Sequence, residues 1–346
     1  SPISIIGNGV VVDPKALLNE ISYLKEKRIE PKLLVSDRCH IIMPYHIELD
    51  SALSGHQAEL AAGSTGRGIA PVYADKMFRN GIRMIDLLEP DILKQKLEKG
   101  YAFAKGIIEK SLNKKITSEP KSIFQDYIDF GIKLKNYVSD TSVELYKAHQ
   151  NGKSILFEGA QGISLDVDHG IYPYTTSSNT AAGHISTGTG VSFRDIGRII
   201  GVVKAYLSRV GESPLPSEID GEMAEKIRDV GGEYGTTTGR PRRIGWLDLV
   251  QVRQAVRVNG LTEIALTKLD VLNGIKEIPV CIDYEIDGST VSEMPASLTM
   301  YRNAKPVYKT LEGWDSIPDN IWDKGFNALP KEIHNYIDFI EQAVGC

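Results

Sequence analysis

The segment Thr267-Lys268-Leu269-Asp270 has the residue types and the spacing to recognise a purine base. It follows an apolar run at residues 264–266, and ligands in open α/β sheets bind outside the carboxyl ends of strands. A carboxylate at Asp270 can accept hydrogen bonds from N1–H and the 2-amino group of guanine, a donor pair that adenine lacks. The segment matches the Asn/Thr-Lys-x-Asp guanine motif. So short a motif is also compatible with a surface cluster at a strand end.

A second segment, residues 235–243, is rich in glycine and arginine and reads Gly-Thr-Thr-Thr-Gly-Arg-Pro-Arg-Arg. Three arginines within four positions cannot be buried without anions, because an unpaired buried charge is costly. The glycines let backbone N–H groups approach a ligand, and arginine forks suit carboxylates and phosphates in two-point contacts. The segment therefore predicts a site for a dicarboxylate, with a solvated basic loop as the alternative.

A third segment, residues 63–68, reads Gly-Ser-Thr-Gly-Arg-Gly and resembles a phosphate cradle of backbone N–H groups. No Gly-Lys-Ser/Thr follows it, so it is not a Walker A loop, and a flexible loop is the alternative. Gln161, after a run predicted to be a buried strand at residues 154–157, could hydrogen-bond a purine edge.

Three polar residues beyond Gln161 raise the question of a metal site: Asp166, Asp168 and His169. Alternation along an extended chain would place Asp166 and Asp168 on one face and His169 on the other. We therefore favour structural hydrogen bonding over metal ligation for these side chains.

The elements that must position these residues alternate between apolar strands and amphipathic helices. This pattern predicts an α/β fold with a mostly parallel central sheet and flanking helices. Strands are expected at residues 3–6, 33–35, 41–43, 154–157, 198–207 and 263–267. Helices are expected after Asp13-Pro14, at residues 222–230 and 247–258, and near the end, where Ile333, Ile337, Ile340 and Val344 share one face.

Two regions depart from that alternation. Residues 91–151 are rich in lysine and mostly helical, which predicts a helical insertion, and residues 280–291 predict a small hairpin that turns at Asp287-Gly288. Because no linker separates two obvious domains, we expect residues 1–346 to form a single α/β domain.

Composition narrows the classes of partner. The formal net charge is −5 over 346 residues, so we expect no nucleic-acid partner. No apolar run approaches the roughly 18 residues that a membrane helix needs, so we expect no membrane partner. Cys39, Cys281 and Cys346 are odd in number and far apart, which argues against disulfides and a zinc ribbon and for a cytoplasmic location.

Taken together and in this order, the segments resemble adenylosuccinate synthetases over nearly the whole chain. The resemblance is carried by residues 6–14, 65–69, 162–179, 235–246 and 266–272. It implies a GTP-dependent ligase of purine (AMP) biosynthesis. GTP phosphorylates the 6-oxygen of IMP, and the amino group of L-aspartate then displaces phosphate to form adenylosuccinate.

The resemblance also implies roles for particular residues. IMP is expected to contact Thr65, Gln161, Thr176 and Arg240, together with Arg79 from the neighbouring subunit, which implies a homodimer. Aspartate is expected to contact Thr236, Thr237, Thr238, Gly239, Arg240, Pro241 and Arg242. GTP, the co-substrate, is expected to contact Arg242, Lys268, Leu269 and Asp270.

Some family features have no counterpart in the 346 residues. The Gly-Asp-Glu-Gly-Lys-Gly-Lys phosphate loop, with its catalytic Asp that also binds Mg²⁺, and the following general-acid His are absent. We therefore expect the chain to be truncated at both ends and inactive by itself, and we name no catalytic residue and no metal ligand. Ala181, His184 and Glu212 also depart from the family pattern.

Two alternatives to a working ligase remain at this point. One is a catalytically inactive protein that binds GTP and IMP. The other is a GTP-dependent switch, which rests on the guanine motif alone. The arginine-rich segment argues against the switch, because a switch needs no grip on a dicarboxylate.

Overall fold

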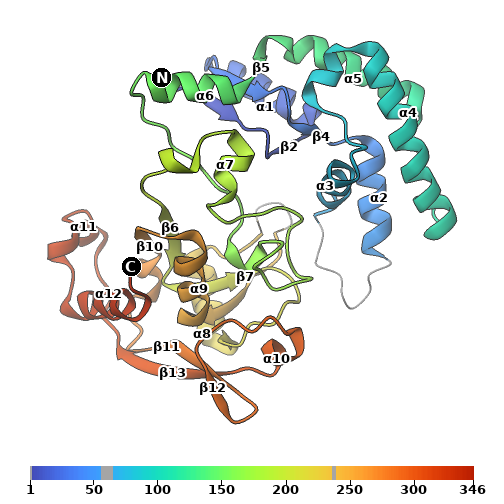
Figure 1. Ribbon diagram of the computed structural model, residues 1–346. Helices are drawn as coiled ribbons and strands as arrows, with labels where there is room; N and C mark the ends of the chain where they lie inside the picture. The colour runs from blue at the N-terminus through green and yellow to red at the C-terminus, as the bar shows by residue number, and fades with distance from the viewer. Residues whose placement is uncertain (1, 56–64, 236–238) are drawn as a thin grey trace. The chain divides into compact units, whose positions relative to one another are not determined.

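The computed structural model describes residues 2–55, 65–235 and 239–346, and Figure 1 labels most of its helices and many of its strands. The chain divides into two compact units. Unit 1 comprises Ser1–Gly162, Asp166–Asp168 and Pro173–Asp195, and unit 2 comprises Ile163–Leu165, His169–Tyr172 and Ile196–Cys346. The prediction that the whole chain forms one domain stays a prediction, and each unit is described by itself.

Unit 1 contains two small parallel sheets covered by helices. One sheet has the order β1 (Ser4–Ile6), β3 (Leu33–Ser36) and β5 (Val138–Ser139), and the other pairs β2 (Val11–Val12) with β4 (His40–Ile41). The helices are α1 (Pro14–Glu26), α2 (Pro44–Ser54), α3 (Ile69–Phe78), α4 (Pro90–Gly106), α5 (Pro120–Leu134), α6 (Thr141–Gln150) and α7 (His184–Thr189). The core gathers fully buried side chains such as Val35, Met43 and Leu93.

Helix α1 begins where the sequence predicts. The Asp13 carboxylate accepts hydrogen bonds from the backbone N–H groups of Lys15 and Ala16, at 2.9 and 3.2 Å, and Pro14 occupies the first turn. Leu17 and Ile21, one turn apart, are buried against the core.

Unit 2 combines one parallel strand pair with two antiparallel sheets. The parallel pair is β6 (Ile200–Lys204) with β10 (Glu263–Thr267). The antiparallel sheets have the orders β7 (Tyr206–Arg209), β9 (Arg243–Trp246), β8 (Glu218–Ile219), and β12 (Ser289–Val291), β11 (Glu277–Ile286), β13 (Lys305–Glu312). The helices are α8 (Gly221–Gly231), α9 (Leu249–Asn259), α10 (Leu298–Arg302), α11 (Asp319–Trp322) and α12 (Lys331–Val344).

Several predictions are confirmed. The α/β fold with parallel strand pairing and flanking helices is observed, although the described strands form five small sheets. Strand β10 has the predicted bounds, the hairpin of β11 and β12 turns at Asp287-Gly288, and α12 buries Ile333, Ile340 and Val344.

Two strand predictions are wrong. Residues 154–157 pair with no strand in the described part of the chain, and Leu156 is 90 % exposed, so apolarity alone did not make a buried strand. The expected strand at residues 198–207 is divided at the buried Ala205 into β6 and β7, which belong to different sheets. One apolar run thus serves two pairing partners, which periodicity cannot reveal.

The region at residues 91–151 is helical in the main. It includes α4, a π-helical turn at Ile107–Ser111, α5 and α6. Figure 1 shows α4 and α5 side by side. The strand β5 lies inside the same region and pairs in parallel with β3, so the region also contributes to a sheet.

Candidate functional site

The arginine-rich segment of unit 2 is closed at its base by a short antiparallel neck formed by Glu233, Tyr234, Pro241 and Arg242. Tyr234 and Pro241 form a β-bridge, and the backbone N–H of Arg242 donates to the carbonyl of Glu233 at 2.9 Å. Inside the neck, Gly235 N–H donates to the carbonyl of Arg240 at 2.8 Å. The predicted ligand residues Thr236, Thr237 and Thr238 lie outside the described residues.

The Glu233 carboxylate accepts hydrogen bonds from β6, from β7 and from the neck. It accepts hydrogen bonds from Lys204 Nζ at 2.6 Å, from Tyr206 Oη at 2.7 Å and from Arg242 Nη1 at 2.7 Å. The Glu233 side chain is only 1 % exposed, whereas those of Lys204 and Arg242 are 31 % and 28 % exposed. One carboxylate therefore faces two cations, and these three groups together carry net positive charge.

The hydrogen bonds to Glu233 stabilise its charged form and so lower its pKa. Burial alone would raise the pKa, but hydrogen bonds from Lys204, Tyr206, Arg242 and Ser208 outweigh it and lower the pKa to about 2. Burial, followed by the hydrogen bond to Glu233, raises the pKa of Tyr206. Glu233 is thus charged and Tyr206 neutral across the physiological range.

The guanine motif lies at the carboxyl end of β10, as the sequence predicts. Lys268 adopts a left-handed backbone conformation with φ of 64°, and Leu269 is buried while Lys268 and Asp270 are exposed. The Lys268 ammonium donates to the carbonyl of Gly231 at 3.0 Å. Two polar side chains of the motif are therefore accessible to a ligand, while Leu269 anchors the turn in the core.

The motif and the neck share a framework within unit 2. Lys204 ends β6 and stands in register with Thr267 of β10, so the Glu233–Lys204 contact joins the neck to this strand pair. A Cβ atom on Gly231 would lie 2.3 Å from Tyr206 Oη, so only glycine fits where α8 meets this tyrosine.

The residues expected at IMP that lie in unit 1 are Thr65, Arg79, Gln161 and Thr176. Thr65 is exposed and lies shortly before α3, whose N-cap residue Gly68 donates its backbone N–H to Asp50 Oδ2 at 2.8 Å. Arg79 is exposed at the other end of α3, with φ of 64°. Gln161 is exposed with φ of 60°, and Thr176 is half-buried. Binding of IMP at these positions stays a prediction.

Asp166 organises the loop that carries Thr176. Its carboxylate is fully buried and accepts hydrogen bonds from the backbone N–H groups of Asp168 at 2.9 Å, Thr180 at 2.5 Å and Ala181 at 3.1 Å. The Asp166 carboxylate thus holds the backbone of this loop, and the preference for hydrogen bonding over metal ligation at Asp166, Asp168 and His169 stays a prediction. Across residues 2–55, 65–235 and 239–346, no group of three or more His, Cys, Asp or Glu side chains is placed to hold a metal ion.

His184, one of the departures from the family pattern, lies on α7 against the loop that follows β1. Its Nδ1 lies 2.8 Å from Thr187 Oγ1, and a Cβ atom on Gly9 would lie 3.2 Å from its Nε2. Gly9 N–H also donates to the carbonyl of Gly188 at 2.8 Å. Burial lowers the pKa of His184, which favours the neutral imidazole within this contact.

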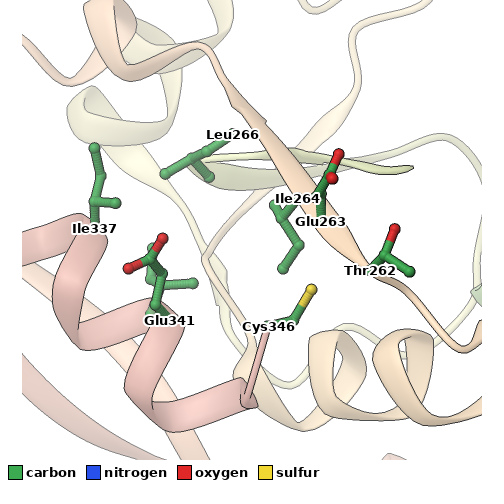
Figure 2. Close-up of a pocket in the computed structure, with 8 residues that line it drawn as sticks. Thr262, Glu263, Ile264, Leu266, Ile337, Glu341 and Cys346 are labelled. Atoms are coloured by element: carbon green, nitrogen blue, oxygen red, sulfur yellow. The ribbon is translucent and has the colours of Figure 1, made fainter. Parts of the chain in front are cut away.

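A cavity of about 250 Å³ opens elsewhere in unit 2, between β10 and α12 (Figure 2). It is lined by Thr262, Glu263, Ile264, Leu266, Ile337, Ile340, Glu341 and Cys346. None of these residues belongs to the predicted site, and Glu263 is paired with Arg198. The hydrogen-bonded cluster around Glu233 is the better candidate, because polar and charged groups converge there.

Sequence reasoning missed Glu233, Lys204 and Tyr206. Each is an ordinary residue type with no motif of its own, and the three lie between 2 and 29 positions apart. The one available signal was Glu233 itself, an acidic residue two positions before a segment with three arginines.

The chain matches the family model described as adenylosuccinate synthetase over residues 1–346. It is 49 % identical over 346 residues to the adenylosuccinate synthetase of Geobacter sulfurreducens, and 46 % identical over 342 residues to that of Thermodesulfovibrio yellowstonii. These alignments cover 99 % and 98 % of this chain and 79 % of each relative. The fully ligated adenylosuccinate synthetase of Plasmodium falciparum superposes with a TM-score of 0.90 at 32 % identity, covering 99 % of this chain and 80 % of that structure.

These matches support the expected ligase function. They lend no support to the alternative of an inactive GTP- and IMP-binding protein. The expectation that the chain is truncated and therefore inactive is not supported by them either. The match over the whole chain, at up to 49 % identity, shows that this chain belongs to the adenylosuccinate synthetase family.

Proposed function

We propose that this protein is a GTP-dependent ligase that joins IMP to L-aspartate through 6-phosphoryl-IMP. The observation that carries the proposal is the arrangement in unit 2. An accessible Lys268–Asp270 motif at a strand end and an arginine-rich segment share one framework with Glu233. A protein that only binds GTP would not need the arginine-rich segment.

The proposed contacts follow the family pattern. IMP contacts Thr65, Arg79, Gln161, Thr176 and Arg240; aspartate contacts residues 236–242; GTP contacts Arg242, Lys268, Leu269 and Asp270. Arg242 would face both aspartate and GTP. Its guanidinium is already oriented by Glu233, and arginine forks favour carboxylate and phosphate oxygens.

The chain's residues thus bind and orient the three substrates. Holding reactants in the correct geometry lowers the barrier by removing translational and rotational freedom beforehand. Mg²⁺ would shield the phosphate charges of GTP. Among the described residues, no group of three or more His, Cys, Asp or Glu side chains fits this ion.

We further propose a homodimer, because Arg79 matches a position that reaches IMP in the neighbouring subunit. A cytoplasmic location is proposed from the three free cysteines. Within the residues that the structure describes, no helix is both long and apolar enough to cross a membrane.

The test is the reaction itself. Purified protein is incubated with IMP, L-aspartate, GTP and Mg²⁺, and adenylosuccinate, GDP and phosphate are quantified by mass spectrometry and a phosphate assay. We expect equal amounts of the three products and no product when any one substrate is omitted. ATP in place of GTP should give much less. GTP hydrolysis without adenylosuccinate, or no turnover at all, would overturn the proposal.

A further inference from the structure

The Glu233 cluster contains a carboxylate that none of the proposed substrate contacts uses. Its side chain is 1 % exposed, so it does not reach a ligand directly. Burying a charge is unfavourable unless it is paired and fully hydrogen-bonded. Three donors, Lys204, Tyr206 and Arg242, satisfy it, and Arg242 is the one of these that the resemblance places at the substrates.

Arg242 is held from several sides. Its backbone N–H donates to the carbonyl of Glu233, its carbonyl accepts from Arg228 Nε at 2.9 Å, and its Nη1 donates to Glu233. An arginine side chain has many rotamers, and fixing it before the ligand arrives removes an entropy cost from binding. The backbone bonds alone would leave the guanidinium free to rotate.

We propose that Glu233 is a positioning residue: it presets the Arg242 guanidinium for aspartate and GTP, and through Lys204 it keeps the neck in register with the strand end that carries the guanine motif. This inference rests on the proposed function. Glu233 is a better choice than a neutral residue because a single carboxylate accepts from all three donors at once.

The test compares Glu233→Gln with two matched variants. Gln has one acceptor oxygen and adds two N–H donors, so it cannot satisfy Lys204, Tyr206 and Arg242 together. Glu233→Asp keeps the charge with a shorter stem. Glu218→Gln removes the carboxylate that pairs with Arg243, one residue beyond Arg242, and so controls for loss of a neighbouring carboxylate–arginine pair.

For Glu233→Gln we expect the KM for aspartate to rise at least about tenfold, a smaller effect than losing a charged group that contacts aspartate directly, because Glu233 acts through Arg242. The Kd for GTP, measured by calorimetry, should rise at least about threefold, because a misoriented arginine weakens but does not abolish the contact. The KM for IMP should change least. The KM for aspartate and the Kd for GTP of Glu233→Asp should fall between those of wild type and Glu233→Gln. Both values should be unchanged from wild type in Glu218→Gln.

A double-mutant cycle separates positioning from general loss of structure. If Glu233 acts through Arg242, then adding Glu233→Gln to Arg242→Ala should raise the KM for aspartate by less than about twofold, because coupled residues are not additive. Additive effects would overturn the inference, as would unchanged aspartate KM and GTP Kd in Glu233→Gln. A wild-type protein that forms no adenylosuccinate would instead refute the proposed function, and the inference with it.

Discussion

At the scale of single residues, the candidate site combines buried side chains, which are fixed by their contacts, with exposed side chains that a ligand can reach. Leu269 is buried and Asp270 is exposed, although they are neighbours in one short turn. Glu233 is buried, whereas Arg242, its partner, is partly exposed. The buried member of each pair fixes the position of the exposed one.

Asp270 is the residue expected to choose the base. Asn at this position offers one acceptor and one donor, which fits the N1–H and 2-carbonyl of xanthine and leaves the second donor of guanine unpaired. Asp270→Asn should lower kcat/KM for GTP by at least about tenfold, roughly 1.4 kcal/mol, and raise it for XTP. The control is Asp315→Asn, an exposed carboxylate paired with Lys276, which should leave the preference unchanged. An unaltered GTP preference in Asp270→Asn would rule out Asp270 as the reader of the base.

Arg240 is expected to serve two anions, the aspartate carboxylate and IMP. Arg240→Ala should raise the KM for both, because losing a charged hydrogen-bonding partner in a desolvated site costs roughly 2–5 kcal/mol. Steady-state kinetics with each substrate varied in turn measures this. Arg257→Ala, which removes an exposed arginine paired with Glu293, is the control. Values for both substrates within about twofold of wild type, roughly 0.4 kcal/mol, would mean that the loop is solvated.

At the scale of elements, the sequence predicted those that carry their own local signals. Asp13-Pro14 marked the start of α1, Asp287-Gly288 marked a hairpin turn, and the apolar run before Thr267 marked β10. The run at residues 154–157 failed, because an isolated apolar stretch does not reveal whether a partner strand lies beside it. The Glu233 cluster was missed for the same reason: its contacts are long-range.

The hydrogen bonds to Glu233 in the neck should make the free energy of unfolding depend on pH. The pKa of Glu233 is lowered in the folded protein to about 2 from its ordinary 4.5, so its contribution is complete above about pH 4.5 and is lost as the pH falls toward 2. The gap in free energy of unfolding between wild type and Glu233→Gln should be larger at pH 7 than at pH 2 by up to about 3 kcal/mol, since each pKa unit corresponds to about 1.36 kcal/mol.

Urea unfolding of both proteins between pH 7 and 3 measures this difference. The gap should be constant from pH 7 to about 5 and should narrow below that. A gap that stays constant down to pH 3 would show that the Glu233 carboxylate is not held as the hydrogen bonds indicate.

At the scale of the whole molecule, the proposed homodimer would bring Arg79 of a second copy of the chain to the site. Arg79 is exposed at the end of α3, directly after Met77 and Phe78, which are 72 % and 61 % exposed. The Phe78 ring also lies 5.9 Å from that of Phe103 on α4. Exposed apolar side chains gathered beside a charged residue are typical of a surface that another protein covers. The family pattern places Arg79 at the partner's IMP.

A shared site makes subunit mixing informative. In a two-fold dimer each subunit completes the other's site, so Arg79→Leu and Arg240→Ala proteins should each be nearly inactive as homodimers. A hybrid dimer has one site with both arginines intact and one with neither. After equal mixing, half of the dimers are hybrids, so activity should recover to about a quarter of wild type. Native mass spectrometry establishes that subunits have exchanged, and each variant mixed with itself is the control. Full exchange without recovery of activity would mean that Arg79 serves no neighbouring site. The exposed apolar residues beside Arg79 would then need an explanation other than a shared site.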